Sequence, residues 1–160
     1  AAEGNFDGLK TILAADATVV DVAGTSVDAS NVIAELNKII TAIPSGVYGS
    51  DDLVLYVSTP IAKAYIQAQA ALGYRELYNV GQTEMNFQGI PMFVTSGLST
   101  NSAVAARKSN LFFGTGLLDD RNEVKVIDMA DLDGSQNVRF VMRYTAGVQV
   151  GVGADVVLYA

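Results

Sequence analysis

The sequence predicts an α+β fold in which a mixed central β-sheet is flanked by helices. Two stretches, residues 31–43 and 60–72, carry apolar residues at helical spacing. Two short runs, 53–57 and 92–95, have the Val, Leu and Tyr or Phe content of buried strands. The chain ends on a long stretch, 138–160, that alternates with period two, and we expect part of Val138–Gly147 to join the same sheet.

The composition is that of one folded domain. The chain has 160 residues, of which 50% are hydrophobic and 17% charged, so it can bury a core of its own. No apolar run is long enough to predict a membrane span. The formal charge of −7 argues against nucleic-acid binding, which requires clustered Lys and Arg, and indicates solubility. The chain begins without Met, and we expect it to be a piece of a longer protein.

The absence of two residue types excludes several kinds of chemistry. The sequence has no Cys and no His. It therefore has no disulfide, no thiolate nucleophile and no Cys-based metal site, and it lacks the usual general base and the commonest metal ligand. We expect no enzyme activity and no cofactor.

The first 30 residues predict a short helix, then a short strand and a loop. Asn5 is a suitable N-cap for the helix. Its apolar face would consist of Phe6, Leu9, Ile12 and Leu13. Residues 15–30 are small and polar, with Gly24 inside, which favours the strand and loop.

Both longer helices have end signals. Ser30 is the expected N-cap of the helix over 31–43, and Pro44 ends it. The signals around 60–72 are Ser58 or Thr59 as the N-cap, Pro60 in the first turn and Gly73 after the last turn.

The second half predicts short strands joined by loops. We expect loops at 73–88, with one short strand near Leu77, and at 97–109; strands at 89–96, 110–116 and 123–129; and an acidic turn at 130–135. Pro91 has no N–H to donate to a strand ladder. The strand over 89–96 should therefore lie at a sheet edge, or Pro91 should stand at the beginning of that strand.

A calcium loop is suggested by residues 129–140 but fails at two positions. With Gly134 at loop position 6, Asp131 and Asp133 fall at positions 3 and 5. Met129 then occupies position 1, and Phe140 occupies position 12, where a bidentate Glu is needed. The segment predicts a turn and no metal site.

Other chemical motifs fail in the same way. Gly151 and Gly153 follow a strand, but Val156 replaces the third glycine of a dinucleotide fingerprint and no helix follows. The pairs Lys108–Ser109 and Ser58–Lys63 lack the S-x-x-K spacing of Ser/Lys catalysis, and surface lysines and a capping serine explain them.

The remaining charged groups have structural explanations. The carboxylate pairs Asp51–Asp52 and Asp119–Asp120 lie in predicted turns, where Asp bonds to its own backbone. The basic groups are Arg107–Lys108 and the strand pair Arg139 and Arg143. We predict no catalytic, cofactor-binding or metal-binding residue.

The terminal stretch must bend. A straight strand over 138–160 would be longer than about 70 Å, whereas a domain of this size has a radius of gyration of about 15 Å. A two-residue hairpin would reverse the parity of the alternation, and the parity is constant. We therefore expect a bent path, with Gly147, Gly151 and Gly153 as kinks, that serves one sheet first and another later. An odd-length turn would also keep the parity.

The order of these segments carries a family resemblance. The segments are SNVIAELNKIITAI, DLVLYVSTPIAKAYIQAQAALG, GIPMFVTSGLS, SNLFFGTGLL, EVKVIDM and VRFVMRYTAGVQVGVGADVVLY. In this order they resemble the C-terminal half of tailed-phage major capsid proteins with the Hong Kong 97-like fold. The resemblance covers nearly the whole chain and rests on pattern and order.

The resemblance implies a structural role. Residues 26–145 would be the axial domain, 1–25 a remnant of the peripheral domain after the spine helix, and 146–160 a strand that returns to the peripheral domain. The chain would self-associate into hexamers and pentamers that enclose the genome, in a virion assembled in the bacterial cytoplasm. The resemblance implies no catalytic residue, no membrane contact and no specific nucleic-acid contact.

The family's lacing elements, its N-terminal arm and E-loop, are not visible in the sequence. We therefore expect this chain by itself to be mainly monomeric in dilute solution. The loops 73–88 and 98–109 are candidates for the axial contacts that remain, because they are long and polar.

Other functions stay open at this point. Within the same architecture, the chain could belong to an encapsulin-like compartment shell. In other classes, it could be a binding or adhesin module, with an exposed aromatic patch, or a small hydrolase that uses carboxylates or a Ser/Lys pair.

Overall fold

The computed structural model describes residues 7–73, 85–115, 124–130, 134, 136–142 and 146–160. Its helices are α1 (Leu9–Ala15), α2 (Val32–Ala42) and α3 (Thr59–Ala71). Its strands are β1 (Val20–Val22), β2 (Leu53–Ser58), β3 (Asn86–Phe87), β4 (Ile90–Thr95), β5 (Ala103–Arg107), β6 (Leu111–Thr115), β7 (Val124–Asp128), β8 (Val138–Met142), β9 (Ala146–Val150) and β10 (Val157–Tyr159). Short 3₁₀ turns, Lys108–Asn110 and Gly153–Asp155, follow β5 and precede β10.

Six strands form the main sheet in the order β1-β10-β5-β2-β4-β3. The pairs β1–β10 and β2–β4 are parallel and the other three are antiparallel, so the sheet is mixed. The ladder between β2 and β4 starts at Met92, directly after Pro91, where the missing N–H breaks no bond of that ladder. The predicted α+β class with a mixed sheet and flanking helices is confirmed.

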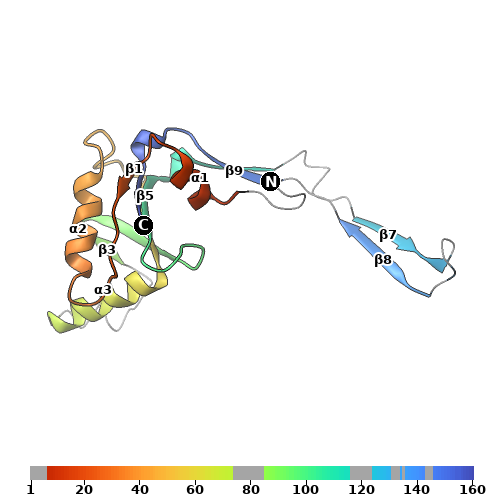
Figure 1. Cartoon of the computed structure of the whole chain (residues 1–160), viewed down its shortest axis with the longest axis horizontal. Helices are drawn as coiled ribbons and strands as arrows, with labels where there is room; N and C mark the ends of the chain where they lie inside the picture. The colour runs from red at the N-terminus through yellow and green to blue at the C-terminus, as the bar shows by residue number, and fades with distance from the viewer. Residues whose placement is uncertain (1–6, 74–84, 116–123, 131–133, 135, 143–145) are drawn as a thin grey trace.

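One face of the main sheet is covered by α2 and α3 (Figure 1). Leu55 and Val57 of β2 are fully buried beneath Leu36 and Ile39 of α2 and the apolar side of α3. This cluster is the larger of two and contains the apolar residues whose helical spacing predicted α2 and α3. Burial of these stripes supplies most of the stabilisation of the two helices.

The ends of the helices follow the local signals with one exception. Ser58 precedes α3, Pro60 lies in its first turn, and Gly73, at φ +90°, follows it. The cap of α2, however, is Asn31 and not Ser30. The carboxylate of Asp28 accepts the N–H groups of Ser30 at 2.7 Å and Asn31 at 3.1 Å, so Asp28 closes the turn that starts this helix.

The helix predicted near the N-terminus is present as α1, and Gly8 precedes it. Leu13 of α1 is buried in a second, smaller cluster on the other face of the sheet, together with Val104, Val150 and Leu158. Asn5 and Phe6, like the short strand expected near Leu77, lie outside the described residues.

The prediction of a loop over 97–109 was wrong, because β5 lies there and pairs with both β2 and β10 near the middle of the sheet. Its residues Ala103, Val104, Ala105 and Ala106 are all at most 4% exposed. Three of them are alanines, which have low strand propensity, and the segment has no period-two alternation since both of its sides are buried.

The terminal stretch serves more than one sheet, as predicted, but its assignment to sheets was wrong. It forms three strands and not one: β8 pairs with β7, β9 with β6, and only β10 enters the main sheet. Thus the described residues of the range 138–147, part of which we expected in the central sheet, lie outside it, and the last strand, β10, lies within it. Gly151 and Gly153 fall at the bend between β9 and β10, whereas Gly147 lies within β9.

No helix among the described residues is long and apolar enough to cross a membrane.

Candidate functional site

The most unusual part of the molecule is the excursion between β5 and β10. These two strands are neighbours in the main sheet, and the chain between them forms two separate two-stranded ribbons. We call β6–β9 the inner ribbon and β7–β8 the outer ribbon. Figure 1 shows both ribbons projecting away from the main body, with the outer ribbon farthest from it.

The inner ribbon is attached to the body by a buried asparagine. Asn110 is 6% exposed; it donates from Nδ2 to the carbonyl oxygen of Val152 at 2.8 Å and accepts the N–H of Val152 at 2.7 Å. Its own carbonyl accepts the N–H of Gly151 at 3.0 Å. Arg107 and Asp155 form an ion pair at 2.5 Å beside it. These contacts join the two chain segments where they leave the sheet and set the direction of the ribbon.

The outer ribbon has an apolar face that none of the described residues covers. Val126 and Phe140 are cross-strand partners, and Val138 lies on the same face, two residues from Phe140. Their exposures are 62%, 71% and 52%. Asp128, the partner of Val138, also lies on this face. The opposite face carries Lys125 and Arg139 together with Ile127 and Val141, which are half-buried.

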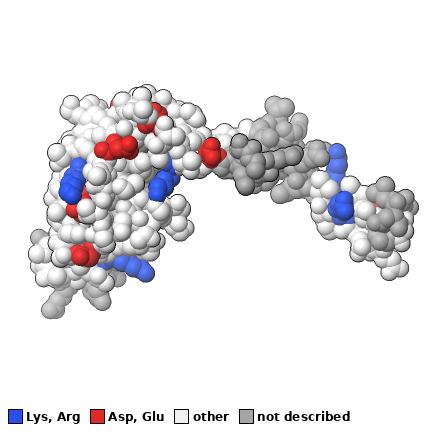
Figure 2. All heavy atoms as spheres, viewed as in Figure 1, with Lys and Arg blue, Asp and Glu red and all other residues white. Residues whose placement is uncertain are grey.

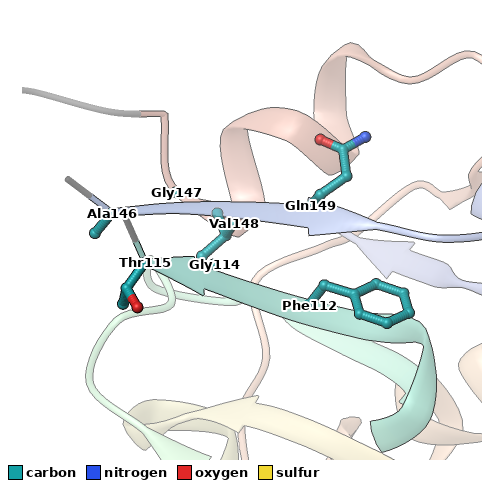
Figure 3. Close-up of a pocket in the computed structure, with 7 residues that line it drawn as sticks. All are labelled: Phe112, Gly114, Thr115, Ala146, Gly147, Val148 and Gln149. Atoms are coloured by element: carbon teal, nitrogen blue, oxygen red, sulfur yellow. The ribbon is translucent and has the colours of Figure 1, made fainter. Parts of the chain in front are cut away.

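The inner ribbon exposes two aromatic side chains. Phe112 is 55% exposed and Phe113 is 68% exposed, and as neighbours in a strand they point to opposite faces. Beside Phe112 lies an open, shallow hollow of about 440 Å³. Figure 3 shows its lining residues, which come only from β6 and β9: Phe112, Gly114, Thr115, Ala146, Gly147, Val148 and Gln149. None of the described residues that line it is titratable, so they offer surface for contact and no acid or base.

Isolated two-stranded ribbons have little stability in water. Of the large apolar side chains that are exposed among the described residues, five of the nine lie on these two ribbons: Phe112, Phe113, Val126, Val138 and Phe140. Exposed apolar surface concentrated in this way marks an interaction site. We therefore take the projecting ribbons as the candidate functional site.

The residues tested for chemistry in the sequence are not brought together. Ser58 is fully buried, whereas Lys63 is exposed on the outside of α3. Ser109 donates to the carboxylate of Asp52 at 2.5 Å, and Lys108 lies over the ring of Phe93. No group of three or more metal-ligating side chains occurs among the described residues. Asp131, Asp133, Asp119, Asp120 and Arg143 lie outside the described residues.

The contact loops predicted from the sequence also differ from the structure. Most of the loop over 73–88 lies outside the described residues, and its end contributes β3. The segment 98–109 contains the buried strand β5 and so cannot be a contact loop over its whole length. The sequence analysis did not identify the ribbons as a site, because an alternating strand looks the same whether its apolar face is covered by its own chain or by another molecule. The sequence signal for the site was the apolar series Val138, Phe140 and Met142, which falls on one face of the terminal stretch.

The buried charges serve the fold. The hydrogen bond from Lys38, followed by that from Tyr159, holds the pKa of Glu35 below its ordinary value. Glu35 lies on α2 and accepts the Tyr159 hydroxyl at 2.8 Å, so it ties β10 to the helix layer. A hydrogen bond from Ser109 lowers the pKa of Asp52. In the view of Figure 2, acidic and basic side chains are scattered over the body in small groups.

Comparisons with known proteins identify the fold. No protein family matches the chain, and no curated protein sequence matches it. Among solved structures, one from Mycobacterium phage Che8 has a TM-score of 0.71 at 16% identity, over 92% of this chain and 54% of that chain. A virus-like particle from Pyrococcus furiosus has a TM-score of 0.54 at 15% identity, over 92% of this chain and 57% of that chain.

The chain thus spans a little more than half the length of the structures it matches. At sequence identities this low, the likeness supports a conclusion about the fold and none about the activity. The fold expected from the resemblance is confirmed: the chain shares its α+β fold with a phage structure and with a virus-like particle.

Proposed function

We propose that this chain is part of a structural subunit of a bacteriophage or prophage shell of the Hong Kong 97-like type. In this proposal it self-associates into hexamers and pentamers that enclose the genome, and it resides in a virion assembled in the bacterial cytoplasm. The support is the likeness in fold to a phage structure, with a TM-score of 0.71 over 92% of the chain.

The observation that carries the proposal is the uncovered apolar surface of the ribbons. Phe113 and Phe140 are 68% and 71% exposed on elements that hold no core of their own. A ribbon of this kind gains stability only when another surface packs on it. Copies of the same chain are the simplest source of such a surface, and a lattice of copies requires several contacts of this kind.

The attachment of the ribbons fits a role in assembly. A contact that sets the geometry of a shell must leave the body in a fixed direction. The double hydrogen bond between Asn110 and Val152 and the ion pair between Arg107 and Asp155 provide this at the base of the inner ribbon. Both lie where the chain leaves and re-enters the main sheet.

The proposal includes no catalysis and no specific nucleic-acid contact. The formal charge of −7 disfavours direct binding of DNA, so a shell of this chain would enclose the genome without specific contacts to it. The candidate site exposes mainly apolar side chains, with Lys125, Asp128 and Arg139 as its charged side chains among the described residues, which supports a role in contact and not in chemistry.

The division into an axial domain over 26–145 and peripheral parts at 1–25 and 146–160 remains a proposal. Within the chain, the main sheet draws strands from all three parts: β1, β2 with β4 and β5, and β10. Axial and peripheral are positions in a capsomer, so a structure of the assembled shell is the measurement that assigns them.

A compartment shell is the second candidate. The likeness to a virus-like particle from Pyrococcus furiosus, with a TM-score of 0.54, supports it. The phage proposal is preferred because the likeness to the phage structure is greater over the same 92% of the chain. The cargo of assembled particles, nucleic acid or protein, separates the two.

Sedimentation across a concentration series tests the proposed function. We expect a monomer at micromolar concentration and reversible association as the concentration approaches millimolar. The double variant Phe113→Asp with Phe140→Asp should remain monomeric throughout. A wild-type chain that stays monomeric up to its solubility limit, or association that the double variant leaves unchanged, would contradict the proposal.

A further inference from the structure

The second face of the main sheet is only half covered. Leu158, Val104, Tyr56 and Phe93 form one row across β10, β5, β2 and β4, since each is the register partner of the next. Leu158 and Val104 are 3% and 4% exposed, Tyr56 is half-buried, and Phe93 is 48% exposed. The helix α1 and the end of β9 therefore cover this face of the sheet over β10 and β5, and the covered part ends at β2.

A groove of about 560 Å³ lies at this boundary. Leu13 and Val104, both almost fully buried, lie at its base. The half-buried side chains around it are Leu9, Tyr56, Leu98 and Leu111. Beyond Tyr56, Phe93 continues the apolar surface, with the two rings 6.3 Å apart.

Two lysines lie at the groove and at the end of its apolar surface, and Asp52 lies beside the second, where its backbone oxygen accepts the N–H of Lys108 at 3.0 Å. Lys10 lies in its wall, and Lys108 lies over the ring of Phe93, with Nζ 5.0 Å from the ring centre. None of the described residues that line the groove is acidic. The groove therefore suits an apolar segment that carries a carboxylate.

We propose that this groove receives the outer ribbon of a second copy of the chain, with Phe140 and Val126 in the groove and Asp128 toward its lysines. The inference rests on the proposed function and deepens it, because it names the surface that each copy offers and the surface that each receives.

The outer ribbon has the matching chemistry. Its exposed face presents Val126, Phe140 and Val138, and the charged side chain on that face is Asp128. Opposite charges across an interface favour one partner and one register more than they add affinity. The ribbon cannot fill the groove of its own copy, because it projects away from the body (Figure 1).

The two surfaces are different, and this decides the symmetry of the contact. If outer ribbons paired with one another, the contact would be isologous and would leave every groove open. A ribbon in a groove is a heterologous contact: each copy gives one ribbon and receives one, so the contact repeats and can close into a ring. Such a contact covers both apolar surfaces at once.

Disulfide trapping tests the contact directly, because the chain has no Cys. Phe140→Cys and Leu98→Cys proteins are purified separately, mixed at high concentration and oxidised. The mixed disulfide should exceed either homodimer. It should also exceed the product of Phe140→Cys with Tyr48→Cys, a control at a 50% exposed position outside both surfaces. A predominance of Phe140–Phe140 crosslinks would overturn the inference.

A complementation experiment tests the same contact without crosslinks. Phe140→Asp and Leu98→Asp should each prevent association, yet an equimolar mixture should form a heterodimer and stop there. The reason is that one protein keeps an intact groove and the other an intact ribbon. An isologous contact predicts no restoration, because a contact between two ribbons would be damaged whenever Phe140→Asp takes part.

The outcomes separate this inference from the proposed function. If the wild-type chain does not associate at any concentration, the proposed function fails. If the wild type associates but the mixture of Phe140→Asp and Leu98→Asp stays monomeric, the ribbon-in-groove contact fails and the shell proposal stands. The Leu98→Cys protein covers the case in which Leu98→Asp does not fold, because Cys keeps an apolar side chain at this half-buried position.

Discussion

The side chain of Asn110 pairs with the backbone of Val152 at two points, donating to its carbonyl oxygen at 2.8 Å and accepting its N–H at 2.7 Å. The pairing mimics one rung of a β-ladder at a place where the ladder between β5 and β10 is interrupted by the 3₁₀ turns. It gives the N–H of Val152 an acceptor and gives the Val152 carbonyl, which also accepts the N–H of Asp155 at 3.3 Å, a second and shorter bond. The base of the projecting ribbons is thus fixed by one residue.

Replacement of Asn110 should weaken this base. Asn110→Ala leaves the N–H of Val152 without its acceptor and removes the shorter of two bonds to the Val152 carbonyl, which should lower the free energy of unfolding by about 1–3 kcal/mol. Asn110→Asp keeps the acceptor and loses the donor, so it should fall between wild type and Asn110→Ala. Urea denaturation measures both. An Asn110→Ala protein as stable as wild type would show that water replaces the side chain without cost.

Gly151 should tolerate no side chain, for a related reason. A Cβ at this position would lie 2.8 Å from Oδ1 of Asn110 and 2.9 Å from the ring of Phe112. Gly151→Ala should therefore cost about 1–3 kcal/mol by overpacking. Gly147→Ala, four residues earlier in β9 and with open space around it, is the matched control and should be close to wild type. Equal losses in the two variants would point to strand flexibility and not to the close approach at Asn110.

Much of the fold could be predicted from local signals. The helix α3 lies between a proline and a glycine that fix its ends, and its apolar positions recur at helical spacing, so its prediction depended on nothing distant. Strand β5 was missed because alanine gives little strand signal, and its position between β2 and β10 is decided by packing. For β10, alternation identified a strand but could not identify its partner, because pairing is a property of two segments.

The candidate site was harder to predict than the fold. Phe140 and Val138 have the parity of a buried face, and an apolar face predicts burial without saying what buries it. In the structure these side chains are exposed, so none of the described residues covers them. The exclusion of chemistry that depends on His or Cys could be predicted in full, because the absence of these residues is read from the sequence alone.

The exposed and buried phenylalanines should respond differently to substitution. Phe140 is 71% exposed, so Phe140→Ala should change the free energy of unfolding by less than about 0.5 kcal/mol. Phe87 is 6% exposed and packs edge-on against Tyr65 at 5.9 Å, so Phe87→Ala should cost about 3–5 kcal/mol. Thermal and urea unfolding measure both. A large loss for Phe140→Ala would mean that this side chain serves the fold of the monomer.

The pH dependence of stability should include a contribution from Glu35. Glu35 is 7% exposed, and the hydrogen bonds from Lys38 and Tyr159 hold the pKa of its carboxyl below the ordinary value of 4.5. Because the folded state favours the charged form, this contribution is complete above the ordinary pKa and is lost as the pH falls below it toward the folded pKa.

Glu35→Gln isolates this contribution. The variant should be less stable than wild type at neutral pH, and the difference should shrink as the pH falls from about 5.5 through the acid range. The pKa values of Asp16, Asp28 and Asp52 are also lowered by hydrogen bonds from neighbouring side chains, but these groups are the same in both proteins and cancel in the difference. Parallel stability curves over this range would contradict the prediction.

The chain should be mainly monomeric in dilute solution even though it carries two uncovered apolar surfaces. A ribbon seated in a groove is one small contact, and an isolated contact well below about 1,000 Å² seldom holds a stable complex against the entropy of association. A shell holds many such contacts at once, so each can be weak alone and strong in the lattice. Light scattering at micromolar concentration should therefore report a species near the chain mass of 16.8 kDa. Megadalton particles from this chain alone would show that its own contacts suffice for assembly, and they would also show that the half of the matched structures that this chain does not span is not needed to close a shell.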